Sequence, residues 1–245
     1  MSFDVWAKTD VGLKRDINQD MILVDPELNL FIVADGMGGH KGGEVASALA
    51  VETVQEVVRN NMQRSQGRIN PKETIAEAYK ISSTRIHQKS TKENPELMGM
   101  GTTMVMALGY KGKIYIGNVG DSRAYLFREP HLWQLTEDHS LINEQVKAGV
   151  ISEADAPHVI GRNVITRSVG YESDVTVDIL VRDCQPGECY LLCSDGLSSM
   201  IPDFRIAQIC QTTPAQDIVT RCIDKAKAAG GDDNVSVIFI RVRSS

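Results

Sequence analysis

Five aspartates at the edges of apolar runs could together bind metal ions in this chain of 245 residues. They are Asp20 in INQD, Asp35 in FIVADGMGGH, Asp121 in IGNVGDSRAY, Asp195 in YLLCSDG and Asp233 in GGDDNVSVIFI. Carboxylates gathered in one cleft raise one another's pKa, so such a cluster stays ionised at neutral pH only if cations lie among them. Because every ligand would be an oxygen, the pattern favours Mg²⁺, Mn²⁺ or Ca²⁺.

The direction of the neighbouring strands decides whether these aspartates meet. Asp35 and Asp195 each follow a short apolar run typical of a buried strand, whereas Asp233 precedes one. If the last strand is antiparallel to the other two, the three carboxylates meet at one edge of the fold. Asp121 follows a further strand-like run and Asp20 opens one, so both can join the same edge.

Hydrophobic spacing predicts the elements that carry these motifs. It indicates an amphipathic helix from Glu44 to about Met62, a second that begins with Pro71 after a capping Asn70, and a third that ends near Gly230. Strand-like runs follow one another without strict βαβ alternation, which favours an α+β fold with antiparallel sheets. These runs comprise residues 21–24, 31–34, 102–108, 113–119, 123–127, 175–181, 190–193 and 235–240.

Composition restricts the class of protein. A hydrophobic share of 42% can supply a sizeable core, and we interpret the chain as one domain spanning residues 1–245. The net charge of −6, without a cluster of Lys and Arg, argues against nucleic-acid binding. No apolar stretch approaches the roughly 20 residues that span a bilayer, and the N-terminus lacks a signal-peptide pattern. We therefore expect a cytoplasmic monomer that does not enter membranes.

The sequence lacks two familiar phosphate-binding patterns, the loop of cysteine phosphatases and the Walker loop. The five cysteines have no zinc-type pairing and lie mostly in apolar runs, which predicts buried reduced thiols. Cys193 is followed by SDGLSSM, not by the phosphate-binding loop of a cysteine phosphatase. GMGGHKGG does not match the Walker pattern of nucleotide-binding loops either.

Eight segments in order make the whole chain resemble the bacterial PP2C-type (PPM) metal-dependent protein serine/threonine phosphatases. They are TDVGLKRDINQD, VADGMGGHKGGEVAS, GTTMVMAL, NVGDSRAYLF, LTEDHSL, RNVITRSVG, LLCSDGLSSMI and GGDDNVSVIFI. The resemblance implies an α-β-β-α sandwich of two antiparallel sheets flanked by helices. It also implies hydrolysis of phosphoserine and phosphothreonine in proteins, in opposition to a Ser/Thr kinase.

The resemblance implies a binuclear Mn²⁺ or Mg²⁺ centre at one end of the sandwich. Asp35 would bridge the two metals, the carbonyl oxygen of Gly36 would bind the second, and Asp195 with Asp233 would complete the first. Asp20 would act through metal-bound water. Two such metals can lower the pKa of a bridging water and stabilise both the attacking and the leaving oxygen, so that no covalent enzyme nucleophile is needed.

A third metal and a phosphate-binding arginine also follow from the resemblance. Bacterial relatives often hold a third, weaker metal, for which Asp121 and Asp195 occupy the matching positions. Arg15, in GLKRD, occupies the position that binds the substrate phosphate. A guanidinium suits this role because it offers a planar fork with a permanent charge.

The proton donor is left open by the sequence. Animal relatives carry a histidine at the position of Met37, where it is proposed to protonate the leaving alkoxide, and this chain departs from that pattern. Either His40 substitutes for it or a metal-bound water does.

Residues of about 139–171 correspond to the flap of the family, and LINEQVKAG within them predicts a short helix. His158, Arg162 and Arg167 could contact a phosphopeptide there or simply lie on the surface.

Two other functions compete with the phosphatase hypothesis. One is a catalytically silent, phosphatase-like binding or sensor module, which the filled ligand positions disfavour. The other is a two-metal phosphodiesterase acting on nucleotides or nucleic acid, which the acidic composition and the absence of a His-rich ligand set disfavour.

Overall fold

The computed structural model describes residues 2–152, 155 and 164–243, except for the side chains of His40 and Lys41. Its strands are β1 (Phe3–Asp10), β2 (Asp20–Asp25), β3 (Leu30–Met37), β4 (Gly101–Thr102), β5 (Met104–Tyr110), β6 (Lys113–Val119), β7 (Arg123–Arg128), β8 (His131–Gln134), β9 (Asp178–Asp183), β10 (Cys189–Cys193) and β11 (Val235–Val242). They form two antiparallel sheets, one in the order β1-β11-β10-β7-β8 and one in the order β2-β3-β5-β6-β9, with β4 beside β3.

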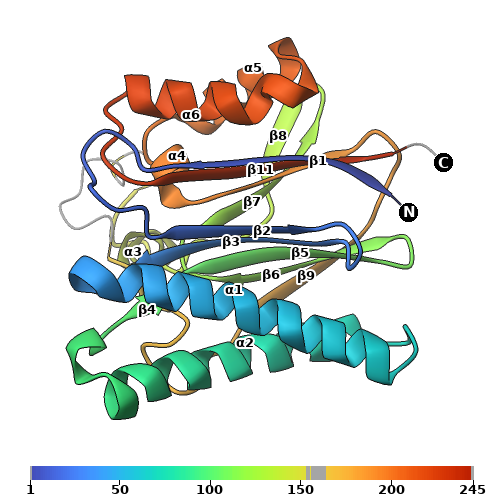
Figure 1. The fold of residues 1–245 in the computed structure, drawn as a ribbon. Coiled ribbons are helices and arrows are strands. Elements are labelled where there is room, and N and C mark those ends of the chain that lie inside the picture. The colour runs from blue at the N-terminus through green and yellow to red at the C-terminus, as the bar shows by residue number, and fades with distance from the viewer. Residues whose placement is uncertain (1, 153–154, 156–163, 244–245) are drawn as a thin grey trace.

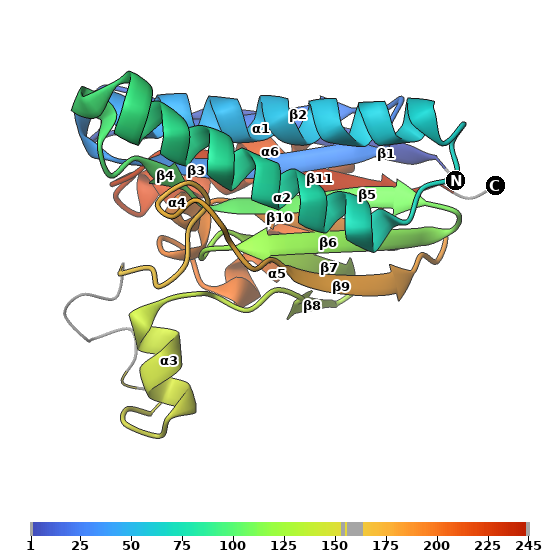
Figure 2. The same ribbon diagram turned by 90° about the horizontal axis from the view of Figure 1, so that it is seen from below.

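Helices cover the outer face of each sheet (Figure 1). The α-helices are α1 (Gly39–Arg64), α2 (Pro71–Gln88), α3 (Leu141–Lys147), α4 (Asp195–Ser198), α5 (Asp203–Thr212) and α6 (Ile218–Ala228), and short turns of other helix types cover Lys89–Glu93, Pro95–Leu97 and Ala215–Asp217. α1 and α2 lie over the sheet that contains β3, and α5 and α6 lie over the sheet that contains β10 (Figures 1 and 2). The predicted α-β-β-α sandwich is therefore confirmed.

The alternation of side chains along the central strands builds three apolar layers. In β3, Ile32 packs with the helix-covered cluster, while Phe31 and Val33 pack between the sheets. In β10, Leu191 faces α5 and α6, and Leu192 faces the other sheet. Because both faces of these strands are covered, their sequences are continuous apolar runs and not alternating ones. The polar residues that follow each run are left at the end of the sandwich.

The observed elements depart from the predicted ones in several places. α1 begins at Gly39 and not at the predicted Glu44, so part of the Gly-rich segment is already helical. The run 102–108 is two strands interrupted at Thr103, whose N–H donates to the Asp35 carbonyl 2.8 Å away instead of to the sheet ladder. The predicted strand 175–181 is observed as β9, which begins only at Asp178. β1, β8, α4 and α5 were not predicted.

Other local predictions are confirmed. α2 begins at Pro71 after an extended Asn70, although the Asn70 side chain makes no capping hydrogen bond. All five cysteines are free thiols, four of them buried and Cys184 half-buried. α3 is the short helix expected in the flap; none of its residues is buried, and it stands apart from the two sheets (Figure 2). Within the described residues, no helix combines the length and the hydropathy that crossing a bilayer requires.

Candidate active site

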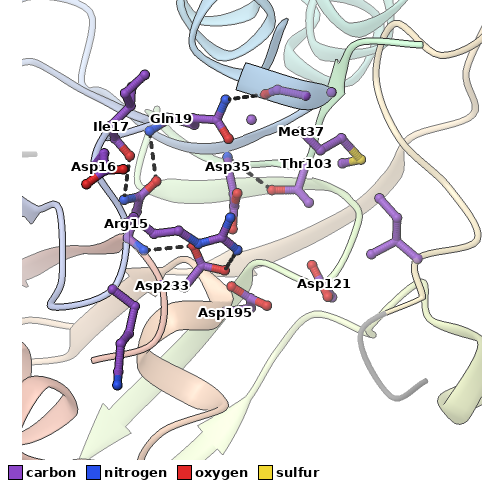
Figure 3. A pocket seen from close by; sticks show the side chains of 16 residues that line it. Arg15, Asp16, Ile17, Gln19, Asp35, Met37, Thr103, Asp121, Asp195 and Asp233 are labelled. Atoms are coloured by element: carbon purple, nitrogen blue, oxygen red, sulfur yellow. Dashed lines mark hydrogen bonds and ion pairs between the residues drawn. The ribbon is translucent and has the colours of Figure 1, made fainter. Parts of the chain in front are cut away.

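A cavity of about 580 Å³ opens at the end of the sandwich where the acidic motifs meet (Figure 3). Four of the five aspartates line it, together with residues of the N-terminal loop and of the Gly-rich segment. The lining residues are Lys14, Arg15, Asp16, Ile17, Gln19, Asp35, Gly36, Met37, Gly38, Gly39, Thr103, Asp121, Ile165, Asp195, Asp233 and Asn234.

Strand pairing explains why these carboxylates lie together. β2 and β3 are antiparallel with Asp20 directly opposite Asp35, so the start of one strand meets the end of the other. β10 and β11 are also antiparallel, which brings Asp195 after β10 next to Asp233 before β11. Asp121 follows β6, which belongs to the same sheet as β3.

Two buried carboxylate oxygens in this cluster have no hydrogen-bond partner among the described residues. They are Oδ1 of Asp20 and Oδ1 of Asp195. The other oxygen of Asp20 accepts a hydrogen bond of 2.7 Å from the hydroxyl of Ser194. A buried carboxylate oxygen without a donor is costly, and a cation is the ligand that would satisfy it. The donor set of the pocket therefore fits divalent metal ions.

The electrostatics of the cluster support the same interpretation. Burial, with the charges of Asp195 and Asp233 added, raises the pKa of Asp20 to about 7. Burial and the charges of Asp195 and Asp138 raise the pKa of Asp121 to about 7. Burial followed by neighbouring carboxylates also raises the pKa of Asp35 and of Asp195. These groups resist ionising together, so cations among them would stabilise the ionised cluster.

Gly36 lies where β3 meets α1 at very close range. A Cβ on Gly36 would lie 2.0 Å from the carbonyl oxygen of Gly43, and a Cβ on Gly43 would lie 2.6 Å from the carbonyl oxygen of Gly36. Neither position can carry a side chain without moving the backbone. The glycines of GMGGHKGG thus let a strand end and a helix start pack together at the rim of the pocket.

Arg15 binds one of the predicted metal ligands. Its Nη2 donates a hydrogen bond of 2.8 Å to Oδ2 of Asp233, and Oδ1 of Asp233 accepts one of 2.8 Å from the N–H of Asn234 (Figure 3). Among the described residues, no group of three His, Cys, Asp or Glu side chains is arranged to hold one ion as it stands.

Two polar residues that support the site, Asn234 and Thr103, were not predicted from the sequence to belong to it. Asn234 donates from Nδ2 to the carbonyls of Val11 and Ile17, 3.0 Å each, and accepts from the N–H of Gln19 at 2.8 Å, which fixes the loop that carries Arg15. Asn234 belongs to the quoted GGDDN motif, so its place in that motif was an available signal.

The hydroxyl of Thr103 accepts a hydrogen bond of 3.2 Å from the N–H of Asp35 and contacts the hydroxyl of Ser122 at 2.7 Å. Thr103 lies in the quoted GTTMVMAL segment, but its partners come from β3 and from the link between β6 and β7.

The histidines and arginines predicted near the site are only partly described by the structure. His40 lies in the first turn of α1, and its side chain is not described; Met37 lines the cavity. His158 and Arg162 lie outside the described residues. Arg167 lines a second hollow of about 900 Å³, which adjoins the first through Met37 and Ile165.

The sequence and the fold are both similar to those of known protein phosphatases. The family model described as Protein phosphatase 2C matches residues 14–229. A serine/threonine phosphatase, stp, of Listeria monocytogenes is 36% identical over 244 residues, which cover 95% of this chain and 93% of the relative. The crystal structure of the serine/threonine phosphatase PstP/Ppp of Mycobacterium tuberculosis has a TM-score of 0.92 at 30% identity, with 100% of both chains covered. A structure of the PstP catalytic domain in complex with two manganese ions has a TM-score of 0.88 at 30% identity and covers 99% of each chain.

Proposed function

The chain belongs to the protein phosphatase 2C family of metal-dependent serine/threonine protein phosphatases, and we propose that the pocket of Arg15 and the five aspartates is its active site. The observation that carries this proposal is a pair of buried carboxylate oxygens, on Asp20 and Asp195, that have no hydrogen-bond partner among the described residues and belong to the aspartate cluster at the cavity that Arg15 lines. Such a pocket offers negative groups for cations and a positive group for a phosphate.

The aspartates would hold the metal ions. Asp35, Asp195 and Asp233, with the Gly36 carbonyl, form the proposed ligand set of two Mn²⁺ or Mg²⁺ ions, to which Asp20 contributes through water. Asp121 with Asp195 would hold a third ion. When bound, such ions activate a water for attack on phosphorus and neutralise charge on the phosphoryl oxygens. The two manganese ions of the PstP complex support this assignment by analogy.

Arg15 would bind and orient the phosphate monoester. Its side chain is about half exposed at the mouth of the cavity, with 52% of its surface accessible. A planar guanidinium can donate two parallel hydrogen bonds to phosphate oxygens, which fixes the ester relative to the carboxylate cluster. His40 is a candidate proton donor to the leaving serine or threonine oxygen, and water is the alternative.

The proposed substrates are proteins phosphorylated on serine or threonine, and the proposed cellular role opposes a Ser/Thr kinase. We further propose that residues 1–245 act as one monomeric domain, with a flap at about 139–171 that contacts the protein substrate. Nucleic acid is not a proposed partner, because the net charge of −6 opposes binding to a polyanion.

Phosphate release from a phosphothreonine peptide tests the proposed function. Purified protein, shown to be folded by circular dichroism, should release phosphate with Mn²⁺ and lose that activity in EDTA. A folded sample that binds the peptide but releases no phosphate would instead be the catalytically silent module. Faster turnover of a bis-ester than of a mono-ester would indicate the phosphodiesterase alternative.

A further inference from the structure

His139 is a buried imidazole to which the proposed reaction gives no role. It belongs to the LTEDHSL segment and is 6% exposed. Both of its ring nitrogens are engaged: Nδ1 lies 3.0 Å from the backbone nitrogen of Gly120, and Nε2 lies 3.0 Å from Oδ2 of Asp178. Its backbone N–H also donates to the Gly120 carbonyl at 3.0 Å. His139 is therefore hydrogen-bonded to both the N–H and the carbonyl of Gly120.

These contacts fix the tautomer of the ring. The backbone N–H of Gly120 can only donate, so Nδ1 of His139 must accept with its lone pair. The ring proton then lies on Nε2, which donates to the carboxylate of Asp178. A neutral imidazole with a defined orientation results, as in sites where a carboxylate orients a histidine that holds a third group.

Gly120 immediately precedes Asp121, the proposed ligand of the third ion. Its φ is +103°, and a Cβ on it would lie 2.5 Å from the Cβ of Thr103, so the backbone is confined on that side. On the other side of Asp121, the hydroxyl of Ser122 contacts that of Thr103 at 2.7 Å. Asp121 is thus held between two anchors, His139 before it and Thr103 after it.

The far end of the contact chain reaches the second hollow. Oδ1 of Asp178 accepts a hydrogen bond of 2.9 Å from Nη1 of Arg167, which lines the hollow beside the active site. The N–H of Thr166 donates to the carbonyl of His139 at 2.9 Å. A continuous series of hydrogen bonds therefore joins Thr166 and Arg167, within the flap segment, to the loop of Asp121.

We propose that His139 is a positioning residue: through its Nδ1 bond to Gly120 it sets the place of the Asp121 carboxylate, and Asp178 orients its ring. This inference rests on the proposed function, because it assumes that Asp121 is a ligand. Catalysis would then depend on the hydrogen bond between the Gly120 N–H and Nδ1 of His139, and not on the volume of the ring.

Two isosteric substitutions separate the two ring contacts. In His139→Asn the amide oxygen lies near the place of Nδ1 and can accept from Gly120, but the contact with Asp178 is lost. In His139→Gln the amide nitrogen reaches toward Asp178, but no acceptor remains for Gly120. Removing a supporting contact of this kind lowers activity or metal affinity by about 10- to 100-fold. We expect this loss in kcat for His139→Gln and His139→Ala, and a change below about threefold for His139→Asn.

Readouts other than turnover accompany the kinetics. Titration calorimetry with Mn²⁺ should show the weakest ion lost or weakened in the Gln variant and retained in the Asn variant. Long-range ¹H–¹⁵N spectra of the wild-type protein should show the His139 proton on Nε2. His131→Asn, at an exposed histidine on β8, serves as the matched control.

The pattern across the variants decides the proposal. Equal loss in the Asn and Gln variants, or better activity in Gln than in Asn, would overturn it, as would a proton on Nδ1. The KM for a phosphopeptide should stay near the wild-type value throughout, because Arg15 is untouched. Failure of the wild-type protein to release any phosphate would instead contradict the proposed function.

Discussion

Arg15 and Asp233 are joined by a hydrogen bond of 2.8 Å across 218 residues of sequence. The proposed phosphate-binding cation and a proposed metal ligand therefore share one contact. A phosphate and Asp233 would share the N–H donors of one guanidinium, and a metal and Arg15 would share the oxygens of one carboxylate. Substrate and metal binding are thus linked through a single pair of side chains.

Substitution of Arg15 should weaken phosphate binding more than metal binding. A hydrogen bond to a charged group contributes about 1.5–3 kcal/mol, so Arg15→Ala should lower kcat/KM for a phosphopeptide about tenfold to a hundredfold. Arg15→Lys keeps the charge but loses the fork and should recover only part of the loss. Steady-state kinetics with Mn²⁺ measure this, and Lys72→Ala, on the exposed face of α2, is the control. An unchanged kcat/KM in Arg15→Ala would remove Arg15 from the site.

Asp121→Asn should separate the third ion from the other two. Asp121 follows β6, whereas Asp20 and Asp35 lie on the paired strands β2 and β3, so its loss leaves the core carboxylates in place. Calorimetry should show two Mn²⁺ ions bound with near wild-type affinity and the weakest one missing, while turnover falls. Loss of all metal binding in this variant would place Asp121 in the core centre instead.

The pH dependence of stability should differ with and without metal. The folded pKa values of Asp20 and Asp121 are raised from 3.8 to about 7, so the folded protein holds protons that the unfolded chain releases in this window. Without metal, stability should fall as pH rises from about 4 to about 7, and level off above that. Mn²⁺ stabilises the ionised carboxylates and should reduce or reverse the fall.

Thermal unfolding in EDTA and in Mn²⁺ across these pH values measures the effect. Asp20→Asn, which removes one of the aspartates with a raised pKa, should flatten the curve recorded in EDTA. A melting temperature in EDTA that rises through this window would show that other groups dominate.

Ser194 should matter for stability although it is no ligand. Its hydroxyl donates to Asp20 at 2.7 Å and accepts from the N–H of Ser236 at 3.0 Å, and the side chain is fully buried. Ser194→Ala leaves both partners unpaired and should cost about 1–3 kcal/mol of unfolding free energy. Urea denaturation of this variant against Ser199→Ala, at an exposed serine, measures it. Equal stability of the two variants would mean that water replaces the lost hydroxyl.

The sequence allowed the layers and the meeting of the aspartates to be predicted because both depend on local patterns. An Asp-Gly pair after an apolar run locates Asp35 and Asp195 at strand ends, and strand direction does the rest. The contacts that fix the site could not be predicted in this way. The bonds of Asn234 to Val11 and Ile17, or of Ser194 to Asp20, depend on which distant segments pack together. His139 likewise lies inside a recognised segment, but its partners are Gly120, in the link after β6, and Asp178, in β9.

Metal binding by Asp35 and Asp233 is the claim on which the rest depends, and titration calorimetry with Mn²⁺ on Asp35→Asn and Asp233→Asn tests it most directly. Asp224→Asn, at an exposed position on α6, is the matched control. We expect both site variants to bind Mn²⁺ much more weakly than the wild-type protein and to lose nearly all turnover, with the control unchanged. Unchanged Mn²⁺ affinity in both site variants would contradict the account.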